Sequence, residues 1–143
     1  MLFTQTQQQT LQATLDRLIP PDDYPGAWEA GVGNYLFRQL DGGDLRHLLP
    51  AYRDGLNALD VEAAAQYGTP FAALDVAQQD ALLHSLETGR VETEWPLTPQ
   101  DFLKMLAHHA AEGYYSDPGN GGNRDEVAWK MIGFEIREAG QVK

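Results

Sequence analysis

The sequence predicts an all-α fold: an irregular bundle of five or six helices with a Gly/Asn-rich loop near the C-terminus. Apolar residues recur at helical spacing in several segments, beginning with Leu11, Leu15 and Leu18. The best candidate for a strand, Arg90 to Trp95, is too short for more than an isolated extended piece. A chain of 143 residues is about one domain and should bury roughly 70% of its unfolded surface. We therefore expect a single helical domain over residues 1–143.

The first two helices should be separated by a proline-rich turn. Residues 5–18 form the first helix, which ends before Pro20. Three prolines in residues 20–26 remove backbone donors and move the preceding residues out of the α region. A second helix is then expected from about Ala27 to Leu40. Two glycines inside it, Gly31 and Gly33, each cost about 1 kcal/mol relative to Ala and indicate close packing.

The remaining helices have visible start and stop signals. Asp41-Gly42-Gly43 ends the second helix, and residues 44–66 continue with a helical stripe that Pro50 should kink or divide. Asp75 and Gln78 form a capping box for a helix that Gly89 closes. Thr98-Pro99 starts another helix, with Pro at the first helical position, where no backbone donor is needed.

The charge of the chain excludes several classes of partner. There are 21 acidic and 10 basic residues, which give a formal charge of −11. The acids are spread evenly, nine in residues 1–72 and twelve in the remainder. Such a distribution argues against binding to nucleic acid or to anionic lipid. It favours solubility and a basic protein partner.

Cysteine usage and the N-terminus give two further expectations. The absence of cysteine excludes disulfides, iron–sulfur ligation and thiolate zinc sites. The first arginine is Arg17, so the N-terminus has neither a basic region nor an apolar region of an export signal. The apolar runs are too short to predict direct membrane insertion. As written, the sequence predicts a cytoplasmic protein.

The sequence gives little support for a nucleophilic active site or for a nucleotide-binding loop. Ser85 lies in an expected helix, and Ser116 precedes Asp-Pro without a Gly-x-Ser-x-Gly context. Residues 119–123 are glycine-rich, but no apolar strand precedes them and no Gly-Lys-Ser/Thr follows. Three carboxylates flank a helix end and a loop, where nothing should raise a pKa, and we interpret them as a solvated acidic edge: Glu87, Glu92 and Glu94.

Histidines leave a metal site open as an alternative. His108 and Glu112 are four residues apart and could share one helix face or a metal ion. His109 points to a different face from His108, and only Asp44-Leu45-Arg46-His47 comes close to a Glu-x-x-His motif. A metalloenzyme would use His47, His108 and Glu112. Solvated or packed histidines are the simpler interpretation.

The most distinctive segment is dense in glycine, aromatics and turn formers. It begins at Gly113, continues through Gly121-Gly122-Asn123, and includes Trp129 and Phe134. Single aromatics of this kind are often core residues, but a group beside a Gly/Pro loop suits an interface hot spot. We predict no catalytic, cofactor-binding or metal residues, and a partner-binding surface made of Pro25, Gly26, Trp28, Gly113, Tyr114, Tyr115, Asp117, Pro118, Gly121, Gly122, Asn123 and Trp129.

These motifs together resemble the gluconate 2-dehydrogenase subunit 3 family, the small subunit of flavin-dependent sugar dehydrogenases. The likeness extends from about Leu11 to Phe134. The segment from Gly113 to Asn123, with Trp129 and Gly133, is its most specific part. The other matching pieces are Leu18-Ile19-Pro20, Pro25-Gly26-Ala27, Ala30-Gly31-Val32, Tyr52, Gly55-Leu56 and Leu59-Asp60.

The resemblance implies a non-catalytic subunit that binds and assists maturation of a large FAD-dependent oxidoreductase. Such a partner, of the glucose-methanol-choline type, would oxidise a sugar or sugar acid and would hold the FAD and the catalytic base. A hetero-oligomer is expected. Family members often carry a twin-arginine export signal, which this chain lacks, so a periplasmic location would need a removed signal or a partner that carries one. A soluble helical adaptor for another protein is a further alternative.

Overall fold

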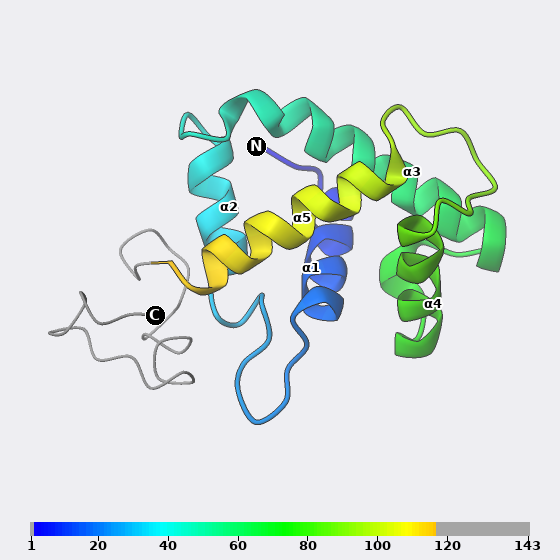
Figure 1. Ribbon diagram of the computed structural model, residues 1–143, viewed down its shortest axis with the longest axis horizontal. Coiled ribbons are helices and arrows are strands. Elements are labelled where there is room, and N and C mark those ends of the chain that lie inside the picture. Colours follow the sequence, from blue (N-terminus) through cyan, green and yellow to red (C-terminus); the bar gives the residue numbers. More distant parts are fainter. Residues whose placement is uncertain (1, 117–143) are drawn as a thin grey trace, which may run out of the picture.

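The computed structural model describes residues 2–116, which fold into five α-helices and two short 3-10 helices without a strand among them (Figure 1). The predicted all-α class is confirmed. The predicted Gly/Asn-rich loop lies outside the described residues. The elements are α1 (Gln5–Leu18), α2 (Val32–Leu40), η1 (Arg46–Leu48), α3 (Leu49–Tyr67), η2 (Phe71–Ala73), α4 (Val76–Glu87) and α5 (Pro99–Tyr114).

Helix ends follow local chemistry. The Asp75 carboxylate accepts from the Gln78 backbone N–H at 2.8 Å, and the Gln78 side chain accepts from the Asp75 N–H, so the predicted capping box is confirmed. A second capping box, between Thr4 and Gln7, starts α1. We did not predict it, although Thr-x-x-Gln is the same kind of signal. At α5 the Thr98 side chain makes no cap hydrogen bond.

The second helix is shorter than predicted. It begins at Val32, and not at Ala27, because Gly31 has a φ of 97°, in the left-handed region that interrupts a right-handed helix. Residues 27–31 form hydrogen-bonded turns, including a 3.0 Å bond from Gly31 N to Trp28 O. Gly33, in α2, is closely packed, but against the Trp28 ring of the preceding turn and not, as its position had suggested, against another helix.

Pro50 divides its segment, one of the two outcomes predicted for it. The residues before it form the short helix η1, and α3 begins at Leu49 with Pro50 in its first turn. Proline is favoured there because the first helical N–H groups have no partner within the helix. The 19 residues of α3 then continue without a break to Tyr67.

The helix α5 joins two hydrophobic cores. Figure 1 shows it lying across α1, with α2 near its C-terminal end and α4 near its N-terminal end. Its Phe102 lies in the larger core, which also contains Leu11, Leu36 and Tyr52. The next residue, Leu103, lies in the smaller core around η2 and α4. Consecutive residues of one helix thus connect both halves of the domain.

A buried carboxylate anchors the connection between α4 and α5. Glu62, in α3, has no exposed surface. Its Oε2 accepts from the Glu92 backbone N–H and from Gln66 Nε2, both at 2.7 Å. Its Oε1 accepts from the Thr93 hydroxyl at 2.5 Å, from Thr93 N at 3.2 Å and from Trp95 Nε1 at 3.2 Å. One side chain therefore fixes the 92–95 segment, a role that we did not predict.

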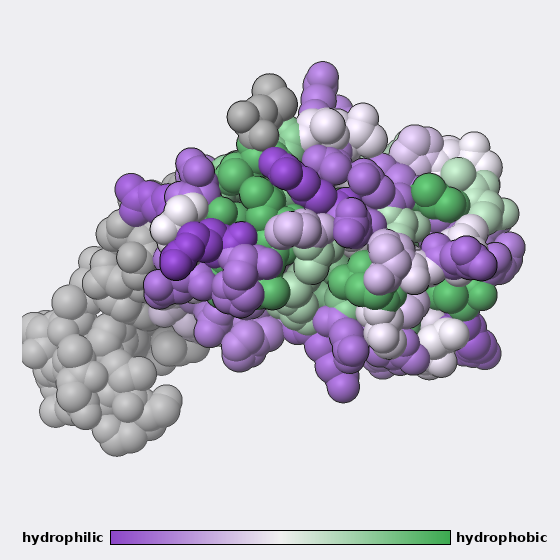
Figure 2. Space-filling view, turned by 90° about the horizontal axis from the view of Figure 1, so that it is seen from above, coloured by the Kyte–Doolittle hydropathy of each residue, from purple (hydrophilic) through white to green (hydrophobic). Residues whose placement is uncertain are grey.

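The face of the molecule in Figure 2 is mostly hydrophilic. On this face, hydrophobic residues show in several separate places between hydrophilic ones. Glu87, Glu92 and Glu94 are exposed, as the interpretation of a solvated acidic edge requires. None of the helices in residues 2–116 is long and apolar enough to cross a membrane.

Candidate partner-binding surface

Two predicted parts of the partner surface, far apart in the sequence, meet at one point. The Tyr114 hydroxyl, at the end of α5, donates a 2.9 Å hydrogen bond to the Pro25 carbonyl oxygen in the turn between α1 and α2. In Figure 1 this turn lies below the C-terminal half of α5. The end of α5 and the proline-rich turn therefore form one surface.

The proline-rich turn is held by its own hydrogen bonds. Its ends are joined by a 2.9 Å bond from Ala27 N to Ile19 O. At its tip, Asp22 N donates to Tyr24 O at 3.0 Å, and Tyr24 N donates to the Asp22 carboxylate at 2.9 Å. An added Cβ at Gly26 would lie 2.9 Å from Pro21 Cδ, so the turn needs glycine there. Such a preorganised loop loses little conformational entropy on binding.

The predicted partner residues differ in accessibility. Gly26, Gly113 and Tyr114 are buried, and Pro25 and Trp28 are half-buried. Tyr115 is 45% exposed, and so it can contact another protein directly. The remaining predicted positions, Asp117, Pro118, Gly121, Gly122, Asn123 and Trp129, lie outside the described residues. The partner surface as a whole stays a prediction.

The predicted partner surface omitted Tyr24, an exposed aromatic residue of the turn. Tyr24 is 40% exposed and comes from the same turn as Pro25. Its position between Asp23 and Pro25 was a usable signal, because an aromatic in a turn of polar residues and prolines has little core to enter.

A groove of about 410 Å³ lies between this turn and α5. The two tyrosines at the end of α5 pack edge to face, with ring centroids 5.3 Å apart, and Tyr115 lines the groove while remaining accessible. The lining is mainly apolar and consists of Leu18, Ile19, Pro20, Asp22, Ala107, Ala111, Tyr114 and Tyr115.

The electrostatics of the groove are acidic. Asp22 supplies a carboxylate to the lining, and exposed Asp23 follows it. Burial raises the pKa of the Tyr114 hydroxyl, and repulsion from Tyr115 in its ionised form and from the Asp22 carboxylate raises it further. Tyr114 therefore stays neutral at physiological pH and acts as a hydrogen-bond donor to Pro25.

The histidines do not assemble the metal site considered above. His108 Nε2 lies 3.3 Å from Glu112 Oε2 on exposed α5 surface, and His47 is exposed in η1. Within residues 2–116, no three His, Cys, Asp or Glu side chains group closely enough to hold a metal ion. The metalloenzyme alternative has no support from the described residues.

His109 belongs to the core. Its Nδ1 lies 2.7 Å from the Tyr52 hydroxyl, and the two rings stack. Burial lowers the pKa of His109, which favours the neutral imidazole that packs here.

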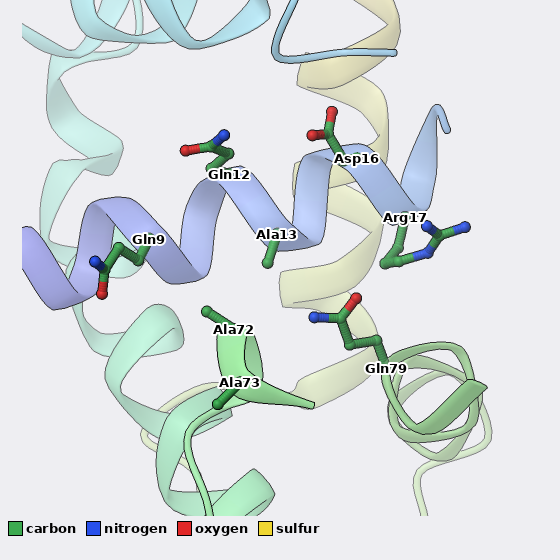
Figure 3. A pocket seen from close by; sticks show the side chains of 8 residues that line it. All are labelled: Gln9, Gln12, Ala13, Asp16, Arg17, Ala72, Ala73 and Gln79. Atoms are coloured by element: carbon green, nitrogen blue, oxygen red, sulfur yellow. The ribbon is translucent and has the colours of Figure 1, made fainter. Parts of the chain in front are cut away.

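A second cavity has a polar lining, but its polar side chains do not point toward a common ligand position. This open cavity of about 530 Å³ lies between α1, η2 and α4. In Figure 3, Ala13, Ala72 and Gln79 face the gap between α1, η2 and α4, whereas Gln12 and Asp16, which also line the cavity, project from α1 away from η2. Three of the five polar side chains in the lining have partners of their own: Asp16 accepts from Trp28 N, Gln79 donates to Phe71 O, and Arg17 pairs with Asp80.

Residues 2–116 thus define a class of protein: a small helical domain with a preorganised turn and an apolar groove, and with no metal-binding group among these residues. The model of the family described as gluconate 2-dehydrogenase subunit 3 matches residues 5–135, most of the chain, and the protein belongs to this family. The resemblance proposed from the motifs is confirmed. Comparison with curated proteins and with solved structures gives no match.

The hydrogen bond between Tyr114 and Pro25 can be tested by removing one oxygen atom. Tyr114→Phe keeps the ring and leaves the Pro25 carbonyl without its donor, so we expect the free energy of unfolding to fall by about 1 kcal/mol. Urea denaturation measures this change. Tyr24→Phe is the matched control and should change stability by less than about 0.5 kcal/mol, because Tyr24 is an exposed residue at the tip of the turn. Equal losses in both variants would contradict the assignment.

Proposed function

We propose that this protein is a non-catalytic small subunit of a dehydrogenase complex, and that it binds a large FAD-dependent subunit and assists its maturation. The observation that carries the proposal is the family match over residues 5–135. A family named as a subunit implies a larger complex. We further propose that the partner is of the glucose-methanol-choline type and oxidises a sugar or sugar acid, with FAD and the catalytic base in that partner.

The geometry supports a binding role for the described residues. The turn from Ile19 to Ala27 is fixed by internal hydrogen bonds, and the Tyr114 hydroxyl ties it to α5. Exposed Tyr24 and Tyr115 offer aromatic area, which interfaces favour because it buries much surface for few rotatable bonds. We propose this surface as the docking site for the large subunit.

Co-expression with a large FAD-dependent subunit from the same organism tests both binding and maturation. We expect a complex that stays intact in size-exclusion chromatography and shows flavin absorbance. We also expect less soluble, flavin-loaded large subunit when this chain is omitted. A large subunit that is fully active and flavin-loaded without this chain would contradict the maturation role. Failure of the two chains to associate would contradict the subunit role.

A further inference from the structure

We propose that the groove between residues 18–22 and α5 receives an apolar segment of the large subunit, and that a Lys or Arg of this segment pairs with Asp22. The inference rests on the proposed function and deepens it, since it names the contact and the chemistry of the partner.

The groove is built for an apolar side chain or short segment. One wall is the chain leaving α1, with Leu18, Ile19 and Pro20, and the other is α5, with exposed Ala107 and Ala111. Small side chains on α5 let a partner segment approach the helix closely. The volume of about 410 Å³ suits a few large apolar side chains, and such buried anchors supply most of the binding energy of an interface.

The walls of the groove are fixed before binding. The hydrogen bond from Ala27 N to Ile19 O closes the turn, and the bond from Tyr114 to Pro25 ties α5 to it. Asp22 also accepts from Tyr24 N, which fixes the direction of its carboxylate. Because the groove is already ordered, binding loses little conformational entropy, and more of the free energy of apolar contact contributes to affinity.

Charge selects a basic occupant. Asp22 lines the groove, Asp23 is beside it, and no Lys or Arg is among the described residues that line it. The nearest basic residue in the sequence, Arg17, is paired with Asp80 at 3.0 Å. The whole chain has a formal charge of −11. A basic partner is therefore attracted to this groove, whereas a second copy of the chain is repelled.

Another possible occupant is the chain's own apolar run at residues 127–136. With its flanks, residues 124–138, the run holds four acidic and three basic side chains and has a formal charge of −1. Its local charge is therefore unfavourable beside Asp22 and Asp23. We therefore favour a segment of the large subunit as the occupant of the groove.

Photo-crosslinking identifies the occupant directly. A benzoylphenylalanine replaces Ala111 in the full chain, which is co-expressed and co-purified with the large subunit, and mass spectrometry locates the crosslink. We expect one segment of the large subunit, mainly apolar and with a Lys or Arg. The same probe at Ala64, exposed on α3, is the control and should give no such crosslink. Crosslinks only to residues 127–136, only to a second copy, or none above the control would overturn the inference.

A single charge change tests the basic contact. Asp22→Asn keeps an oxygen to accept from Tyr24 N and removes the negative charge. We expect the dissociation constant of the complex to rise roughly fivefold to tenfold at low salt, with a weaker salt dependence. Asp54→Asn, an exposed position on α3, is the matched control. If the complex forms and Asp22→Asn binds as the unmodified chain does, the groove inference fails and the subunit role stands; if no complex forms, both fail.

Discussion

Replacing Glu62 with Gln should lower the free energy of unfolding by about 3 kcal/mol, since five donors converge on this buried carboxylate. Gln has the same shape, but its NH₂ group would face donors in either orientation: the two from Gln66 and Glu92, or the three from Thr93 and Trp95. An unpaired buried donor costs about 1–3 kcal/mol.

Chemical denaturation measures this loss, and Glu87→Gln provides the control. Glu87 ends α4 and is exposed, so the same chemical change there should alter stability by no more than about 0.5 kcal/mol. Similar unfolding midpoints for the Glu62→Gln variant and the unmodified chain would show that the 92–95 segment does not depend on this carboxylate.

The same substitution has a pH signature. Burial alone would raise the pKa of Glu62, but the hydrogen bonds from Thr93, Gln66, Glu92 N and Trp95 outweigh it and lower the pKa. A carboxylate with a lowered pKa contributes its stabilisation above its unfolded value of 4.5 and loses it as the pH falls through the folded value. The stability difference between the unmodified chain and Glu62→Gln should therefore be constant near neutral pH and shrink below pH 4.5.

Much of the fold was predictable because helix signals are local. Capping boxes, prolines in first turns and apolar stripes each involve residues within about one turn of each other. The start of α2 was wrong by five residues, since the helical stripe continues through a stretch that Gly31 interrupts. The glycine was visible in the sequence, but the apolar pattern does not show that it adopts the left-handed conformation.

The candidate partner-binding surface depends on contacts between residues far apart in the sequence, which the spacing of motifs does not predict. Tyr114 and Pro25 are 89 residues apart. We predicted both as partner-binding residues, but nothing in the sequence indicated that they contact each other. Glu62 gave a weak signal that we did not use: it lies three residues after buried Leu59 and next to buried Ala63. A charge within an apolar helical stripe indicates either an error in the stripe or a carboxylate with buried partners.

The contact between α3 and α5 gives a second large expected effect. A Cβ added at Gly55 would lie 2.2 Å from Cε1 of the Phe102 ring, which has no exposed surface. Gly55→Ala gains about 1 kcal/mol of helix propensity, but overpacking costs about 1–3 kcal/mol or more. Since the ring is enclosed on all sides and cannot move away, we expect a net loss of about 2 kcal/mol in denaturation experiments.

A double-mutant cycle separates this overlap from other effects of the substitution. Phe102→Leu removes ring atoms that meet the new methyl group, so Gly55→Ala should be less damaging in that background than in the unmodified chain. Val61→Ala, at a position 55% exposed on the same helix, should be close to neutral. A stable Gly55→Ala protein would mean that α3 and α5 can separate at little cost. The expected loss instead means that Gly55 sets the distance between them, and through α5 the position of the tyrosines that line the groove.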